Sequence, residues 1–115
     1  MQIVFGTAHP LKTEYLRGHL PTVKVGLYGG ILTPDTVTIE HLVPKVQHGR
    51  TTYSNLVLAT KENNNRRGSL PLKRFVTEEQ VQTYLNQFKG VITDTGFVGD
   101  CYIRRVEPTL KSLLK

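Results

Sequence analysis

The sequence is poor in cysteine and in long apolar runs, and each shortage excludes a class of protein. Cys101 is the only cysteine among 115 residues, so the chain can form no internal disulfide and no cysteine cluster for zinc. We interpret Cys101 as a small core residue. No apolar run approaches the roughly 18 residues that cross a bilayer, and the first residues lack the basic start and long apolar middle of a secretion signal. We therefore expect a cytoplasmic protein with no membrane partner.

Acidic residues are also scarce, 9 against 15 lysines and arginines, and the excess of positive charge is local. Between residues 45 and 74, seven basic residues face a single acid, so this segment carries the whole formal net charge of +6. Binding to a polyanion requires such a concentration, because each neutralised phosphate releases condensed counterions. A solvated surface would show the same charge, so composition alone leaves nucleic-acid binding open.

The length and composition predict one domain over residues 1–115, because 38% hydrophobic and 21% charged residues are ordinary globular values. Strands are predicted where apolar residues alternate or β-branched residues cluster. These segments are residues 1–5, 21–28, 36–44 and 56–60. The second strand should end in a turn at Gly29 and Gly30, and residues 45–54 should form a connecting loop.

Helices are predicted at residues 10–17 and 61–67, with Gly68 ending the second. A further helix should begin at Thr77, where Gln80 stands three residues on as in a capping box, and should end by Gly90. The C-terminal tail should form two short helical pieces, because Pro108 would interrupt a continuous helix.

The most informative segment runs from residue 38 to residue 69. It carries an acid–histidine pair, an apolar exit ending in proline, a loop glycine, a short apolar strand led by asparagine, a second asparagine and a basic–glycine pair. In order, these are Glu40-His41, Leu42-Val43-Pro44, Gly49, residues 55–58, Asn64 and Arg67-Gly68. The segment resembles the motif of the HNH endonuclease family, with 14 residues from His41 to Asn55 and 9 from Asn55 to Asn64.

This resemblance implies an α+β fold with a ββα-metal (His-Me finger) core at about residues 36–70, extended by an N-terminal strand and helix and by C-terminal helices. It implies that His41 is the general base, and that Glu40 and Asn64 hold Mg²⁺ or Mn²⁺. Asn55 is counted among the catalytic residues but should act by hydrogen bonds that hold the loop. No zinc is expected, because threonine and asparagine occupy positions 60 and 63, where related proteins carry cysteines.

Phosphodiester hydrolysis explains these residue types. A neutral imidazole can take a proton from water near pH 7, and a hard cation can neutralise charge on the phosphate through carboxylate and amide oxygens. Adjacent strand residues point to opposite faces, so Glu40 and His41 can share a site only if the strand ends or bends there. Pro44 favours such an ending.

The expected partner is double-stranded DNA, and the oligomeric state is left open. Basic side chains of the motif segment are the candidates for contacting phosphate. They are Lys45, His48, Arg50, Arg66 and Arg67. Tyr53 could stack on a sugar or base or belong to the core, whereas His9 and His19 are interpreted as structural or surface residues.

Two other functions stay open. The chain could be a catalytically silent HNH scaffold that binds nucleic acid or acts as an inhibitor or interaction partner, or an RNA-binding protein of ribosomal type. Short stand-alone HNH proteins resemble those of phage and mobile-element genomes, so a phage-encoded protein in a bacterial host is one expectation.

Overall fold

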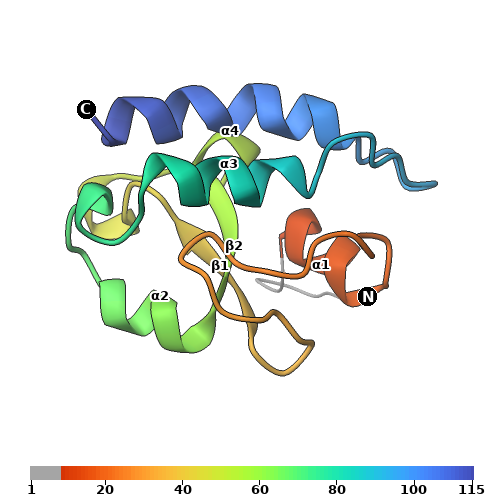
Figure 1. The fold of residues 1–115 in the computed structure, drawn as a ribbon, viewed down its shortest axis with the longest axis horizontal. Helices are drawn as coiled ribbons and strands as arrows, with labels where there is room; N and C mark the ends of the chain where they lie inside the picture. The colour runs from red at the N-terminus through yellow and green to blue at the C-terminus, as the bar shows by residue number, and fades with distance from the viewer. Residues whose placement is uncertain (1–8) are drawn as a thin grey trace.

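The computed structural model describes residues 9–115, so the strand predicted at residues 1–5 lies outside the described part of the chain. In that part, four α-helices surround one antiparallel hairpin in an α+β fold. The helices are α1 (Pro10–Leu16), α2 (Lys61–Arg67), α3 (Glu78–Asn86) and α4 (Gly99–Leu113), the strands are β1 (Val37–His41) and β2 (Leu56–Thr60), and the short 3-10 turns are η1 (Lys45–Gln47), η2 (Tyr53–Asn55) and η3 (Leu72–Arg74). Figure 1 shows α3 and α4 side by side on one side of the hairpin, with α2 on the other.

The hairpin confirms both strands predicted around the motif, although β1 is shorter than expected. Its register places Val37 opposite Thr60 and His41 opposite Leu56. The sequence predicts a strand that continues to Pro44, but the pairing ends at His41. Beyond that residue the backbone turns into the loop that carries η1 and η2.

All five residues of β2 are buried, and the edge of β2 away from β1 meets two helical tyrosines and the Leu27 backbone, whose N–H donates to the Leu58 carbonyl at 3.0 Å. The Leu58 backbone N–H donates to the Tyr84 hydroxyl at 2.9 Å, and the Tyr102 hydroxyl donates to the Leu56 carbonyl at 2.7 Å. The two hydroxyls lie 2.9 Å apart. Within residues 9–115 the sheet has two strands, and because buried backbone groups need partners, α3 and α4 supply hydroxyl groups to the free edge of β2.

The helix boundaries follow capping chemistry. The Thr60 side chain accepts from the Asn63 N–H at the start of α2, and Gly68 follows its end with φ of 53°. At α3, Thr77 and Gln80 form the predicted capping box. The helices expected at residues 10–17 and 61–67 and from Thr77 are therefore confirmed.

The strand predicted at residues 21–28 is wrong. In the described part of the chain the segment folds back on itself and forms no strand, and Val25 and Ile31 form an isolated bridge across the turn. Gly29 and Gly30 both have positive φ, so the expected turn is present and closes the segment within a few residues.

The predicted break in the C-terminal tail is also wrong, because α4 is continuous through Pro108. Proline cannot donate the bond that the Arg104 carbonyl would receive, but both residues are exposed, so water can serve that carbonyl. On the opposite side of the helix, Tyr102, Val106 and Leu110 are buried in the core. This packing holds the helix together across the proline.

Cys101 is exposed, so its interpretation as a core residue is wrong. It precedes the buried Tyr102 on α4, and its side chain lies outside the hydrophobic core. Within residues 9–115, none of the helices has both the length and the hydropathy of a membrane span.

Candidate functional site

His41 is the last residue of β1, and its half-exposed ring faces the loop that follows. The ring Nε2 lies 3.0 Å from the Thr51 hydroxyl. Partial burial lowers the pKa of His41, and the positive charge of Lys45 lowers it further. The imidazole is therefore neutral at pH 7 and able to accept a proton.

Asn55 closes the loop between the two strands. Its side-chain oxygen accepts from the Val43 N–H at 2.8 Å, and its amide nitrogen donates to the carbonyls of Val43 at 3.1 Å and Arg50 at 2.8 Å. This arrangement agrees with the loop-holding role expected for Asn55. Gly49 completes the closure, because a Cβ there would lie 1.6 Å from the Val43 carbonyl oxygen.

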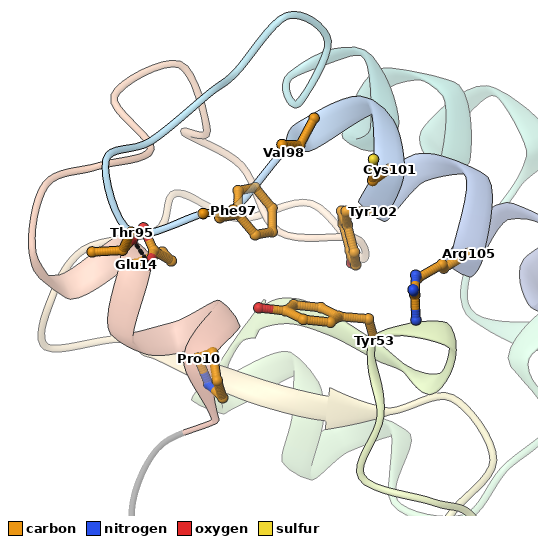
Figure 2. Close-up of a pocket in the computed structure, with 10 residues that line it drawn as sticks. Pro10, Glu14, Tyr53, Thr95, Phe97, Val98, Cys101, Tyr102 and Arg105 are labelled. Atoms are coloured by element: carbon orange, nitrogen blue, oxygen red, sulfur yellow. Dashed lines mark hydrogen bonds between the residues drawn. The ribbon is translucent and has the colours of Figure 1, made fainter.

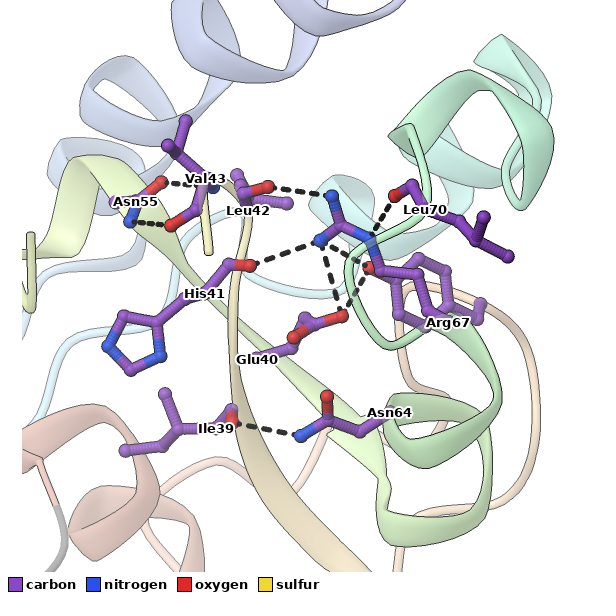
Figure 3. A network of polar contacts seen from close by, with 10 residues as sticks. Ile39, Glu40, His41, Leu42, Val43, Asn55, Asn64, Arg67 and Leu70 are labelled. Atoms are coloured by element: carbon purple, nitrogen blue, oxygen red, sulfur yellow. Dashed lines mark hydrogen bonds and ion pairs between the residues drawn. The ribbon is translucent and has the colours of Figure 1, made fainter. Parts of the chain in front are cut away.

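Glu40 points to the other face of β1 and is part of a buried polar network (Figure 3). Its Oε2 accepts from the Tyr28 hydroxyl at 2.7 Å and lies 3.4 Å from Arg67 Nη1. Glu40 is only 5% exposed. Burial raises the pKa of the Glu40 carboxyl, while the contacts from Tyr28 and Arg67 favour its charged form and offset part of that rise.

This geometry corrects the metal-binding role expected for Glu40. The strand does not bend before its last residue, so the carboxylate and the His41 ring lie on opposite sides of β1 (Figure 3). The Arg67 guanidinium already neutralises the carboxylate, and its positive charge would repel a divalent cation placed at the same oxygen. The residues present therefore do not fit a Mg²⁺ ion held through Glu40.

Asn64 reaches from α2 towards β1 (Figure 3), and its Nδ2 lies 3.3 Å from the Ile39 carbonyl oxygen. Its amide oxygen is the atom left to meet a cation or a phosphate. A single neutral oxygen is a weak site for Mg²⁺, which proteins bind through one or two carboxylates. Among the residues that the structure describes, no three histidine, cysteine, aspartate or glutamate side chains come together as metal ligands.

Arg67 is not available to phosphate, which corrects the nucleic-acid contact expected for it. The side chain is 3% exposed, and its guanidinium donates to the carbonyls of Leu70, His41 and Leu42. The other candidate phosphate contacts are exposed, on the loop after β1 and on α2. They are Lys45, His48, Arg50 and Arg66.

Sequence reasoning missed Tyr28 and Thr51 as contributors to this region, and it missed the inward role of Arg67. Arg67 stands three residues after Asn64 on the same short helix, so both side chains face the strands, and this spacing could have revealed that Arg67 is inward. Tyr28 and Thr51 carry no comparable local signal. Their contacts with Glu40 and with His41 join segments that lie 12 and 10 residues apart in the chain.

His9 and His19 have structural roles, in agreement with their interpretation from the sequence. His9 caps α1 by accepting from the Leu11 N–H at 3.0 Å, and His19 lies 3.0 Å from the Glu14 carboxylate. The His9 ring also contacts Tyr53 edge to face, with centroids 4.7 Å apart.

A comparison with models of known protein families and with curated proteins found no match for this chain. The resemblance to HNH nucleases therefore depends on the residues of the motif alone.

Proposed function

We propose that this protein is an HNH endonuclease that hydrolyses DNA phosphodiester bonds, with His41 as the general base. In this proposal β1, β2 and α2 are the ββα core that the resemblance implies. The observation that carries the proposal is the position of His41: a neutral, half-exposed imidazole at the end of β1, beside the loop that carries the exposed Lys45 and Arg50.

In this proposal the neutral ring of His41 is the tautomer protonated at Nε2. The Nε2–H then donates a hydrogen bond to the Thr51 hydroxyl oxygen, 3.0 Å away, and Nδ1 is unprotonated. Nδ1 takes a proton from water as the water oxygen attacks phosphorus, and the bond from phosphorus to the leaving oxygen breaks. The leaving oxygen is protonated by solvent.

Positive charge for the phosphate comes from the loop. Lys45 is near enough to His41 to lower its pKa, so a phosphate placed at His41 is also close to the Lys45 ammonium. Arg50 is exposed on the same loop and can contact a flanking phosphate. Dependence on Mg²⁺ or Mn²⁺ stays a prediction.

The Glu40–Arg67 pair favours a second candidate function, a catalytically silent nucleic-acid-binding protein on the same scaffold. If the carboxylate stays with Arg67 when DNA is bound, the site lacks its expected cation ligand, while the exposed basic residues still bind phosphate. This candidate predicts binding without cleavage.

Nicking of supercoiled plasmid separates the two functions. The protein should nick plasmid with Mg²⁺ or Mn²⁺, the metal dependence being checked with EDTA, and His41→Ala should be slower by about 10² to 10⁴ fold. The matched control is Gln47→Ala, an exposed residue of the same loop, which should nick at the wild-type rate. If wild type and His41→Ala both shift plasmid in a gel without nicking it, the silent binding protein is the correct function.

A salt titration tests the phosphate contacts separately from chemistry. Changing Lys45, Arg50 and Arg66 to glutamine should weaken DNA binding and flatten the dependence of log affinity on log salt. The slope should fall by about one unit for each phosphate that the variant no longer neutralises. An unchanged slope would remove these residues from the DNA interface.

A further inference from the structure

A pocket of about 480 Å³ lies beside the candidate site, between α1, η2, the loop around residue 95 and α4 (Figure 2). We call it the Tyr53 pocket, and its lining includes Glu14, Tyr53, Phe97, Cys101, Tyr102 and Arg105. We propose that it receives one unstacked nucleobase of the bound nucleic acid. This inference rests on the proposed function, because it assumes that the protein binds nucleic acid.

The wall of the pocket is aromatic. The Tyr53 ring lies opposite Phe97 and Tyr102 in Figure 2, with centroids 5.9 and 6.1 Å apart. These are contact distances between rings, so a base cannot slide between them. Phe97 and Tyr102 are buried, whereas Tyr53 is half-exposed, so the base would lie against the part of the Tyr53 ring that Phe97, Tyr102 and His9 leave exposed. Such stacking tolerates any sequence, because every base has a π-face.

The two ends of the pocket carry opposite charges, which fixes how a nucleotide would enter. Glu14 lies at one end, where the Thr95 hydroxyl hydrogen-bonds to its carboxylate (Figure 2). His19 hydrogen-bonds to the same carboxylate at 3.0 Å. Although burial opposes the charge, these contacts hold the pKa of Glu14 below its usual range, so the carboxylate is ionised at neutral pH. A carboxylate repels phosphate but accepts hydrogen bonds from the amino and ring N–H groups of bases.

Arg105 is exposed at the other end of the pocket. A guanidinium attracts phosphate, so the sugar–phosphate side of the nucleotide would face Arg105 while the base points towards Glu14. The charges therefore favour a base over a free phosphate in the interior of the pocket.

The pocket is connected to His41 through two short paths. Tyr53 follows Thr51 by two residues, and the Thr51 hydroxyl lies 3.0 Å from His41 Nε2. The Tyr53 ring also contacts His9, which is close enough to His41 for their charges to interact. A nucleotide whose base is in the pocket would thus have a neighbouring phosphate near His41, as in enzymes that extrude a nucleotide from the stack.

Binding of short oligonucleotides in EDTA tests the pocket without any cleavage. The probes are a fluorescein-labelled single strand of eight thymidines and the same backbone made of abasic residues, measured by fluorescence anisotropy. Tyr53→Ala should bind the thymidine strand about 5- to 150-fold more weakly than wild type, the range expected for one stacked base, and should bind the abasic strand equally well. Tyr53→Phe, which keeps the ring, should restore most of the affinity.

Chemical modification gives a second test, in which Tyr53 itself is not changed. Cys101 is the only cysteine, is exposed and lines the pocket, so N-phenylmaleimide attached to it should fill the space. The modified protein should lose affinity for the thymidine strand but not for the abasic strand. In Cys101→Ser the reagent finds no thiol, and binding before and after treatment should be the same. If Tyr53→Ala does not fold, the modification of Cys101 alone tests whether the pocket holds a base.

The outcomes separate the pocket from the proposed function. If both changes weaken binding of the two strands equally, or weaken neither, the pocket does not hold a base, even where His41-dependent nicking is observed. If wild type binds neither strand, the pocket is overturned, and binding and nicking of double-stranded plasmid decide the proposed function separately. Base-dependent weakening without any nicking supports the pocket in a silent binding protein.

Discussion

Glu40 and Arg67 form an ion pair, 3.4 Å from Oε2 to Nη1, with side chains that are 6% and 3% exposed. The pair joins β1 to the last residue of α2. Tyr28 donates a hydrogen bond to the same carboxylate oxygen, so a third segment is attached to the same point. Glu40 and Arg67, which the motif predicts as metal-binding and phosphate-binding residues, thus hold the hairpin and α2 together.

Removing one partner of this pair should be costly, because the other charge is left buried and unpaired. We expect Arg67→Met to lower the free energy of unfolding by about 3 to 5 kcal/mol. The matched control is Arg66→Met, its exposed neighbour on the same helix, which should change the stability by less than about 0.5 kcal/mol. Urea denaturation followed by circular dichroism measures both. Equal stability of the two variants would contradict the buried pair.

Asn55 should matter for the fold through its three hydrogen bonds to the loop. Asn55→Ala leaves the Val43 N–H and two carbonyls without this partner and should cost about 1 to 3 kcal/mol in urea denaturation. Asn55→Asp should not rescue it, because a carboxylate would face the Val43 and Arg50 carbonyl oxygens. The control is Asn65→Ala, an exposed asparagine of α2, for which a change under about 0.5 kcal/mol is expected.

Thr51 should act as a positioning residue for His41. Thr51→Val has nearly the same shape but offers no oxygen to Nε2, so the ring loses its orientation and plasmid nicking should slow by about tenfold. Thr51→Ser keeps the hydroxyl and should keep most of the rate. If valine and serine variants nick equally fast, the Thr51 contact has no catalytic role. The unfolding midpoint of each variant serves as the check that the fold is retained.

The protonation of His41 can be followed without any activity. Burial and Lys45 both lower the pKa of His41, so by proton NMR its ring should titrate below the ordinary value of about 6.5. Lys45→Gln removes one of the two causes, so the pKa should move up. Lys61→Gln, which changes an exposed lysine of α2, should leave it in place. Nicking should accordingly rise with pH through the His41 pKa and level off near neutrality.

An upward shift in Lys45→Gln and none in Lys61→Gln would place the Lys45 charge beside the imidazole. The same shift in both variants would instead reflect the general positive charge of the segment from residue 45 to residue 74. A His41 that titrates at or above its ordinary value would contradict the neutral base at pH 7.

Local chemistry explains which parts of the fold could be predicted. Thr77 and Gln80 form their capping box within four residues, and β2 and α2 are encoded by their own residues and by the glycine that follows the helix. The segment at 21–28 shows the opposite case: Val23 and Leu27 are buried in the core, so their alternation imitates a strand. Within residues 9–115 the segment forms no strand, although the Leu27 N–H donates to the Leu58 carbonyl of β2 at 3.0 Å. In α4, burial of one side of the helix overrides the effect of Pro108.

The candidate site divides in the same way. The motif by itself determined that His41 lies on a strand, that a basic loop follows and that Asn55 holds this loop, because these features depend on residue type and short spacing. It did not determine that the strand ends at His41, since the predicted strand continues to Pro44. Tertiary structure alone decided that Glu40 is paired with Arg67, that Thr51 meets the His41 ring and that an aromatic pocket opens beside Tyr53. Each of these three features joins segments that are separated in the sequence. Its formation depends on the free energy of tertiary packing, which no single segment determines.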